Sequence, residues 1–308
     1  MVIVFTLLAA LSNAVNEATQ HIASIAAPRR SSGWRLVVYL FRNPLWLFGW
    51  VALAGAFVFQ ALALHNGEIS VVQPLLATEL VLMLVLRRFW IHQAIRPITW
   101  LVGAVTCIGL VVFIGAGQPG GGQPTPISHH WLTAALACCA GAAVMSVLAR
   151  WGSPSLRAAL YASAAAVMWA LVATFIKATT DTLTQFGVGG TFIRWPVYAL
   201  VVGSVAALFV QQASLHVGPL RASQPLLVIV DPIVSITLAM WIFGEHFTDN
   251  AAALAAAAVG FAVMCASVIL LTPTAPATMT AAGPDGQEGG QRGTASRGGR
   301  AAASGFSG

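Results

Sequence analysis

Nine apolar stretches follow one another along the chain, each close to the roughly 20 residues that a helix needs to cross the hydrocarbon core of a bilayer. Only 8% of the 308 residues are charged and 58% are hydrophobic, whereas soluble domains carry about a quarter charged residues. We therefore expect an all-α polytopic membrane protein with about nine transmembrane helices. The predicted spans cover residues 2–26, 45–64, 68–86, 98–117, 131–149, 155–176, 196–216, 222–243 and 251–271.

The placement of the basic residues predicts how these spans are oriented, because lysine and arginine favour cytoplasmic loops. The odd-numbered connections and the C-terminal tail hold thirteen of the fifteen basic residues, and the even-numbered connections hold only Lys177 and Arg194. We expect the N-terminus outside and the C-terminus in the cytoplasm. Arginine outnumbers lysine fourteen to one, as in GC-rich bacterial genomes, so the expected location is a bacterial plasma (inner) membrane.

The composition changes after Leu271. Residues 273–308 are mainly Gly, Ala, Ser and Pro with scattered charge, a composition that cannot bury a core. We predict a transmembrane domain over 1–272 and a disordered cytoplasmic tail over 273–308. The four cysteines lie in apolar runs without metal-ligand spacing, so we expect no disulfide framework, no metal site and no cofactor.

One passage of the sequence occurs twice. Residues 60–76, QALALHNGEISVVQPLL, and residues 211–227, QQASLHVGPLRASQPLL, are identical at eight of seventeen positions with a constant offset of 151 residues. The same offset relates Gly109 to Gly260. Gln, His, Gly and Pro make up five of the eight identities, and chance similarity between Leu- and Ala-rich helices would not select these residues. We interpret the pattern as an internal duplication.

The offset maps the first four spans onto the last four. Corresponding spans are five crossings apart, so each copy must cross the membrane in the direction opposite to its counterpart. The chain is thus predicted to hold an inverted-topology repeat, about 1–117 and about 155–272, joined by a connector helix at about 131–149. Many secondary transporters have this architecture and bind substrate near the middle of the bilayer, between the two repeats.

The repeated motifs resemble the drug/metabolite transporter (DMT) superfamily, in particular its EamA-like members. The second half shows a helix that contains proline, a Gly-Glu pair at its end (Gly244 and Glu245) and a closing helix with a central glycine, Gly260. The stretches that carry the resemblance are QPLLATELVLML in the first half, and QPLLVIVDPIVSITLAMWIFGEHF and AAAAVGFAVMCASVILL in the second.

The resemblance covers about residues 1–272 and implies an EamA/DMT-like bundle. That family typically has ten helices, and by this resemblance we expect the chain to correspond to the last nine. The resulting nine-helix layout, with the entry PLWLFGW, is similar to the NIPA-type magnesium transporters of the same superfamily. Relatives export amino acids, metabolites and drugs or move cations, so the resemblance does not identify a substrate.

Three acidic residues fall inside predicted spans, where a charged side chain costs about 2.5–3.5 kcal/mol and commonly serves a function. The first, Glu17, shares one face of its helix with Asn13 and Gln20, and Asn16 flanks that face. A face of this polarity cannot point at lipid. It either lines a cavity or forms a hydrogen-bonded seam with a neighbouring helix.

The other two acids are Glu79, midway along the third span, and Asp231, in the eighth. Pro232 follows Asp231 and cannot donate a backbone hydrogen bond, which frees the carbonyl group of Val228. A carboxylate beside an opened backbone is a candidate site for a cation or a proton. The alternative for each acid is a packing role, as a protonated group bonded to a neighbouring helix.

Several further residues occupy matching places in the two repeats. Gln60 pairs with Gln211, followed by Gln212, and these amides suit either a polar substrate or hydrogen bonds between helices. Pro74 and Pro225 are predicted to lie in the first turn of their spans, where proline is tolerated and shapes the helix entrance.

Two other patterns do not indicate sites. The stretch GAGQPG at 115–120 spells G-x-G-x-x-G, but it follows a span and opens no helix. His129 and His130 are adjacent, so they point apart on a helix, and the sequence offers no third ligand. We expect neither an enzyme nor a nucleic-acid partner.

Three functions are compatible with these observations. The first is a secondary transporter of a small polar or cationic solute (a metabolite, amino acid or drug), with export as the expected direction. The second is a divalent cation transporter, which requires carboxylates that converge on one ion. The third is a non-transporting membrane scaffold or assembly protein, which a flexible basic tail favours. The expected partners are the lipid bilayer and a small-molecule or ion substrate, and a homodimer is also compatible.

Overall fold

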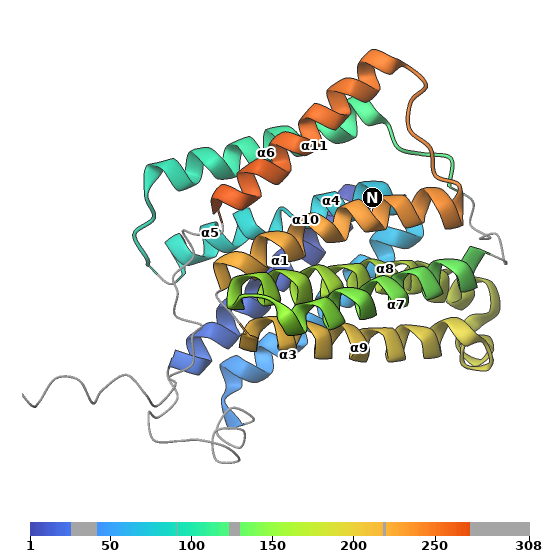
Figure 1. Ribbon diagram of the computed structural model, residues 1–308, viewed down its shortest axis with the longest axis horizontal. Helices are drawn as coiled ribbons and strands as arrows, with labels where there is room; N and C mark the ends of the chain where they lie inside the picture. The colour runs from blue at the N-terminus through green and yellow to red at the C-terminus, as the bar shows by residue number, and fades with distance from the viewer. Residues whose placement is uncertain (26–41, 91, 123–129, 218–219, 272–308) are drawn as a thin grey trace, which may run out of the picture. The chain divides into compact units, whose positions relative to one another are not determined.

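The computed structural model describes residues 1–25, 42–90, 92–122, 130–217 and 220–271 (Figure 1). Nine helical spans in these ranges are long and apolar enough to cross a membrane. The prediction of an all-α multi-pass membrane protein is thereby confirmed. The tail predicted from residue 273 onward lies outside the described residues. The helices are α1 (Val2–Ile25), α3 (Pro44–Asn66), α4 (Ile69–Leu76), α5 (Glu79–Phe89), α6 (Pro97–Gly117), α7 (His130–Leu148), α8 (Pro154–Ile193), α9 (Trp195–Val217), α10 (Leu220–Leu238), the π-helical η2 (Ala239–Phe243) and α11 (Ala251–Leu271).

Local sequence signals explain where several helices begin. Pro44 is the first residue of α3 and Pro154 the first of α8, where the missing N–H costs no hydrogen bond. The side chain of Asn43 caps α3 by accepting a hydrogen bond of 3.0 Å from the N–H of Leu45. Such caps satisfy the free backbone donors at a helix start.

Helix α8 is longer than predicted. The apolar pattern placed the end of this span at residue 176, but the helix continues to Ile193 and is interrupted only by the non-helical backbone of Gly187 (φ 67°, ψ −178°). No proline or glycine stops the chain directly after Ile176. Lys177 and Asp181, which we had placed in a connection, therefore lie on α8 and are buried.

The positions predicted for Pro74 and Pro225 were wrong. Both lie inside helices, each as the sixth residue, since α4 begins at Ile69 and α10 at Leu220. Their rings therefore act in the second turn, where proline removes a hydrogen bond and crowds the preceding carbonyl groups. Pro232 is also inside α10, as predicted.

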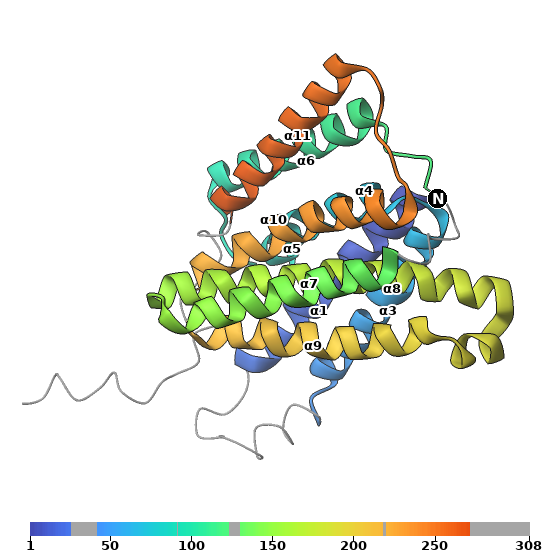
Figure 2. The same ribbon diagram turned by 45° about the vertical axis from the view of Figure 1, so that its right-hand side comes forward.

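The helices pack in three extended pairs: α1 along α3, α8 along α9, and α6 along α11. Figures 1 and 2 both show α6 beside α11. Helices α4 and α10, from opposite halves of the sequence, contact one another, and α10 also packs on α8. The main hydrophobic core surrounds α8, where Phe175 stacks on Trp131 of α7 with ring centroids 5.8 Å apart.

Helices α6 and α11 meet through two glycines. A Cβ atom on Gly109 would lie 2.7 Å from the carbonyl oxygen of Gly260, and one on Gly260 would lie 2.8 Å from the carbonyl oxygen of Gly109. Only a residue without a side chain permits this backbone approach. The contact joins the two residues that the 151-residue offset relates.

Candidate functional site

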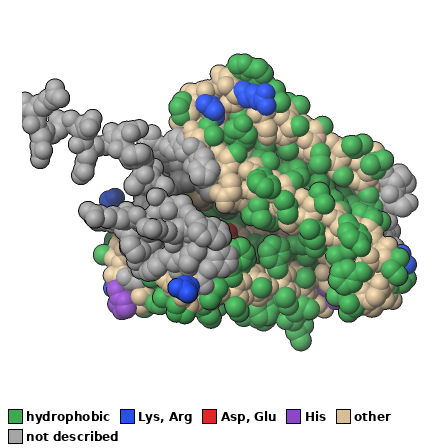
Figure 3. Space-filling view, turned by 90° about the horizontal axis from the view of Figure 1, so that it is seen from below, with side chains coloured by type: hydrophobic (Ala, Val, Ile, Leu, Met, Phe, Trp, Pro, Cys, Tyr) green, Lys and Arg blue, Asp and Glu red, His purple; other side chains and the backbone are tan. Residues whose placement is uncertain are grey.

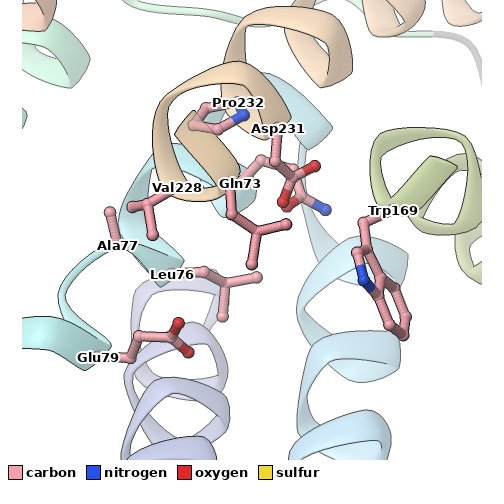
Figure 4. A pocket seen from close by; sticks show the side chains of 9 residues that line it. Gln73, Leu76, Ala77, Glu79, Trp169, Val228, Asp231 and Pro232 are labelled. Carbon is pink, nitrogen blue, oxygen red and sulfur yellow. The ribbon is translucent and has the colours of Figure 1, made fainter. Parts of the chain in front are cut away.

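A cavity of about 100 Å³ lies among α4, α5, α8 and α10 (Figure 4). Two of the three acids predicted from the sequence, Glu79 and Asp231, are on its wall. Glu17 of α1 is exposed and does not line it. The lining residues are Gln73, Leu76, Ala77, Glu79, Trp169, Leu227, Val228, Asp231 and Pro232.

An interruption between α4 and α5 positions Glu79. The backbone N–H of Ala77 donates to the carbonyl of Pro74 and that of Thr78 to the carbonyl of Leu75, both at 3.1 Å. These are the tighter bonds of a 3₁₀ turn, which often marks a functional break in a helix. Glu79 then lies in the first turn of α5, where the helix dipole favours a negative charge.

Helix α10 presents the second carboxylate to the cavity. Asp231 accepts a hydrogen bond of 3.2 Å from the hydroxyl of Ser235, one turn further along the helix. Pro232 has no N–H, so the carbonyl of Val228 cannot have its usual helical donor. The α10 part of the cavity wall thus contains a carboxylate and a residue whose backbone carbonyl lacks its usual helical donor.

The polar face of α1 reaches the site through one residue. The amide nitrogen of Asn13 donates to a carboxylate oxygen of Glu79 at 3.2 Å, which joins α1 to α5. Gln20 instead donates to Asn16 on the same helix at 2.7 Å. Of the residues predicted on this face, Asn13 alone has a hydrogen bond to a cavity-lining residue among those that the structure describes.

The glutamines identified by the repeat have different environments. The side-chain carbonyl of Gln211 accepts a hydrogen bond of 2.8 Å from the indole nitrogen of Trp169, which fixes the ring at the cavity wall. Gln60 is half-buried and Gln212 is exposed, and neither lines the cavity.

Two cavity residues whose side chains can form hydrogen bonds, Gln73 and Trp169, were not recognised as site residues in the sequence. Gln73 opens the repeated Gln-Pro-Leu-Leu motif, so the repeat itself was an available signal. Trp169 had none, because a tryptophan in an apolar helix is ordinarily a packing residue.

A second polar group, the Lys177 cluster (Lys177, Glu68 and Glu245), lies where α4 begins. The Lys177 ammonium is 3.4 Å from a carboxylate oxygen of Glu68 and 3.5 Å from one of Glu245, and it donates to the carbonyl of Gly67 at 3.1 Å. The sequence placed Lys177 and Glu245 in connections and Glu68 at the very start of a span, yet the Lys177 side chain is only 8% exposed. His65 and Asp181 are near Glu68 and Lys177 in the sequence, and the Nδ1 atom of His65 lies 3.3 Å from a carboxylate oxygen of Asp181.

Glu245 also caps α4. Its carboxylate accepts hydrogen bonds from the backbone N–H groups of Ile69 (2.8 Å) and Ser70 (3.0 Å), two free donors at a helix start. Burial raises the pKa of the Glu245 carboxyl, while the Lys177 ammonium and these hydrogen bonds act in the opposite direction. Glu68 in turn accepts from the N–H of Gly122 at 3.2 Å.

One face of the molecule shows few charged side chains. Figure 3 shows a face that is largely hydrophobic, with a few basic side chains, where acidic atoms are visible only inside a hollow. Among the described residues, no group of three His, Cys, Asp or Glu side chains is placed to hold a metal ion. His130 instead has its Nδ1 atom 2.9 Å from the carbonyl of Trp241.

Comparison with known proteins does not assign a family. No protein family matches the chain, and no solved structure is similar to it. The chain is 27% identical over 280 residues to an uncharacterized protein of Corynebacterium glutamicum. The aligned region covers 89% of this chain and 95% of that protein. A relative of similar length and unassigned activity leaves the function to be inferred from the site.

Proposed function

We propose that this chain is a secondary transporter of the DMT type, which moves a small polar or cationic solute by alternating access. The observation that carries the proposal is the cavity between α4 and α10, with the carboxylates of Glu79 and Asp231 on its wall. Discontinuous helices that present charged side chains and backbone carbonyls to a midplane cavity are typical substrate sites in secondary transporters.

The inverted repeat is part of this proposal. In a pair of inverted repeats, residues near the symmetry axis meet their own counterparts. The cavity is lined by two pairs related by the 151-residue offset, Leu76 with Leu227 and Ala77 with Val228. Gly109 and Gly260, in mutual contact, obey the same offset. These contacts support an axis that passes through the cavity and between α6 and α11.

The Lys177 cluster supports alternating access. Glu245, from the second repeat, caps α4 of the first repeat, and in the predicted topology this contact closes the external side of the cavity. The 151-residue offset relates Glu245 to Ala94, which has no carboxylate to form the equivalent contact at the cytoplasmic side. We propose that the cluster opens when the cavity is accessible from outside.

The competing functions make different demands on the site. A divalent cation carrier needs about six or more oxygen ligands around one ion, and the described residues offer two carboxylates at the cavity. A scaffold needs no acidic cavity at all, and its carboxylates are expendable for function.

The test uses the full chain reconstituted in liposomes that contain a pH-sensitive dye. Small amines, amino acids and Mg²⁺ are added in turn, and the uptake of each solute is recorded together with proton movement for the wild type, Glu79→Gln, Asp231→Asn and, as control, Asp249→Asn, whose side chain is exposed. We expect solute-dependent flux to fall about tenfold or more in the two cavity variants, which corresponds to a loss of at least about 1.4 kcal/mol, and to persist in the control. Equal flux in all four proteins would contradict a role of these acids, and no flux with any solute in the wild type would contradict transport.

A further inference from the structure

The charge of the cavity restricts the ligands that it can take. Of the described residues on its wall, two are acids and none is Lys, Arg or His. The buried ammonium of Lys177 is held in its own cluster by Glu68 and Glu245. A ligand with a positive charge is therefore attracted to Glu79 and Asp231, whereas a ligand carboxylate would face two acids without a cationic partner.

The aromatic residue on the cavity wall favours an organic cation over a metal ion. Trp169 lines the cavity (Figure 4) and is oriented by its hydrogen bond to Gln211. An indole ring attracts ammonium groups through its π face. A desolvated metal ion instead needs several oxygen ligands, which an indole cannot supply.

Gln73 adds a requirement for a hydrogen-bond acceptor. Its side chain is on the cavity wall, the residue is 4% exposed, and its amide nitrogen has no hydrogen-bond partner among the residues that the structure describes. A buried donor without an acceptor is costly. An oxygen atom of a ligand in the cavity would satisfy it.

The cavity is also small. Its volume of about 100 Å³ is well below the roughly 300–1,000 Å³ of pockets that hold drug-sized ligands. This space suits a ligand of only a few non-hydrogen atoms.

From these four observations we infer that the cavity selects a small organic ammonium ion that also carries an uncharged oxygen acceptor, an amino alcohol being the simplest member of the class. This inference rests on the proposed function for its biological meaning. The ammonium lies between the acids and the indole ring, and the oxygen accepts a hydrogen bond from Gln73. Gln73 is thus the residue that distinguishes an amino alcohol from a plain amine.

Isothermal titration calorimetry on the purified full chain tests this assignment with four probes. Ethanolamine has both groups, ethylamine lacks the oxygen, glycine replaces the hydroxyl group by a carboxylate, and Mg²⁺ is a bare cation. We expect ethanolamine to bind about tenfold or more tightly than ethylamine, because a buried donor left unpaired costs about 1–3 kcal/mol. We also expect it to bind more tightly than glycine, whose carboxylate faces the two acids, and than Mg²⁺, which lacks enough oxygen ligands at this site. Similar affinities for ethanolamine and ethylamine, or tighter binding of glycine or Mg²⁺, would overturn the assignment.

Two variants locate the selectivity. Gln73→Leu should bind ethanolamine and ethylamine equally, with unchanged affinity for ethylamine, while Gln212→Leu, which alters an exposed glutamine outside the cavity, should retain the preference. If Gln73→Leu does not fold, Gln73→Asn shortens the donor and should reduce the preference. If the Gln73 variants still bind ethanolamine more tightly than ethylamine, the role inferred for this residue is wrong.

The outcome is separable from that of the proposed function. If ethanolamine binds with the expected selectivity but no solute moves in liposomes, the ligand assignment stands and transport fails. If glycine moves in a Glu79-dependent manner without any preference for ethanolamine, transport stands and the ligand assignment fails.

Discussion

The ammonium of Lys177 lies 3.5 Å from a carboxylate oxygen of Glu245, although 68 residues separate them in the chain. Lys177 comes from α8, and Glu245 follows η2 and caps α4. Both residues belong to the second predicted repeat, and the cap that Glu245 forms on α4 connects them to the first. A buried charge is stable only when it is paired and hydrogen-bonded, so the pair should matter for stability as well as for the proposed closure.

Replacement of Lys177 by Met should destabilise the protein by about 3 kcal/mol, because removal of one partner leaves a buried carboxylate uncompensated. This loss is at the low end of the roughly 3–5 kcal/mol observed when one partner of a buried pair is removed, because Glu245 can bind a proton and so lose its charge. The midpoint of thermal unfolding in detergent measures the effect. Arg150→Met, which removes an exposed charge, is the control. The double variant Lys177→Met/Glu245→Gln should recover part of the loss, and a Lys177→Met protein as stable as the control would refute the role of the pair.

Glu245 should make stability depend on pH in a defined direction. Burial raises its pKa above the ordinary value of 4.5, so above this pH the folded state binds more protons than the unfolded chain, and the free energy of unfolding falls as pH rises. The contribution is complete below pH 4.5 and is lost as pH rises through the pKa of the folded state.

Thermal unfolding of wild type and Glu245→Gln, measured from pH 4.5 to neutral pH, tests this expectation. The stability of the wild type relative to the variant should decline across the range. Two curves that run parallel would show that Glu245 does not titrate in the folded protein as inferred.

Replacement of Gly109 by Ala should weaken the contact of α6 with α11. The new Cβ atom would lie 2.7 Å from a backbone oxygen of Gly260, and a backbone atom cannot move aside as a flexible side chain can. Overpacking of this kind costs about 1–3 kcal/mol. Gly141→Ala in α7, where nothing lies within 4 Å of the added atom, is the matched control. Equal unfolding midpoints for the two variants would argue against close packing at these glycines.

Gly187 should tolerate no side chain for a different reason. It has space for a Cβ atom, but its backbone (φ 67°, ψ −178°) lies in a region that is essentially restricted to glycine, and another residue there costs about 1–3 kcal/mol. Gly187→Ala should therefore lower the unfolding midpoint. Gly189→Ala, also in open space but helical, should leave the midpoint unchanged or raise it, because alanine favours a helix. If Gly189→Ala lowered the unfolding midpoint more than Gly187→Ala did, the non-helical backbone at Gly187 would be contradicted.

The acids of the site were predictable, but their surroundings were not. Glu79 and Asp231 stand out in the sequence because a carboxylate in an apolar run is costly and therefore conspicuous. Gln73 and Trp169 belong to the same cavity, yet residues of these types occur in many membrane helices without lining a site. Only the packing of α4 against α10 and α8 places them beside the acids.

The Lys177 cluster was missed because two of its members were assigned to connections. Lys177 and Glu245 lie at the ends of apolar runs, where charges ordinarily reach water. Their burial depends on the extension of α8 beyond Ile176 and on the backbone donors of α4, which no local pattern describes.

The sequence by itself determined which segments cross the membrane, and the last predicted span, 251–271, matches α11 at both ends. This is so because the length of an apolar run is a local property that the thickness of the bilayer selects. Only the tertiary structure decided which polar side chains share a cavity and which charges become buried. The lining of the cavity and the burial of these charges depend on which face of each helix packs against helices that are distant in the sequence. Local sequence patterns do not specify that packing.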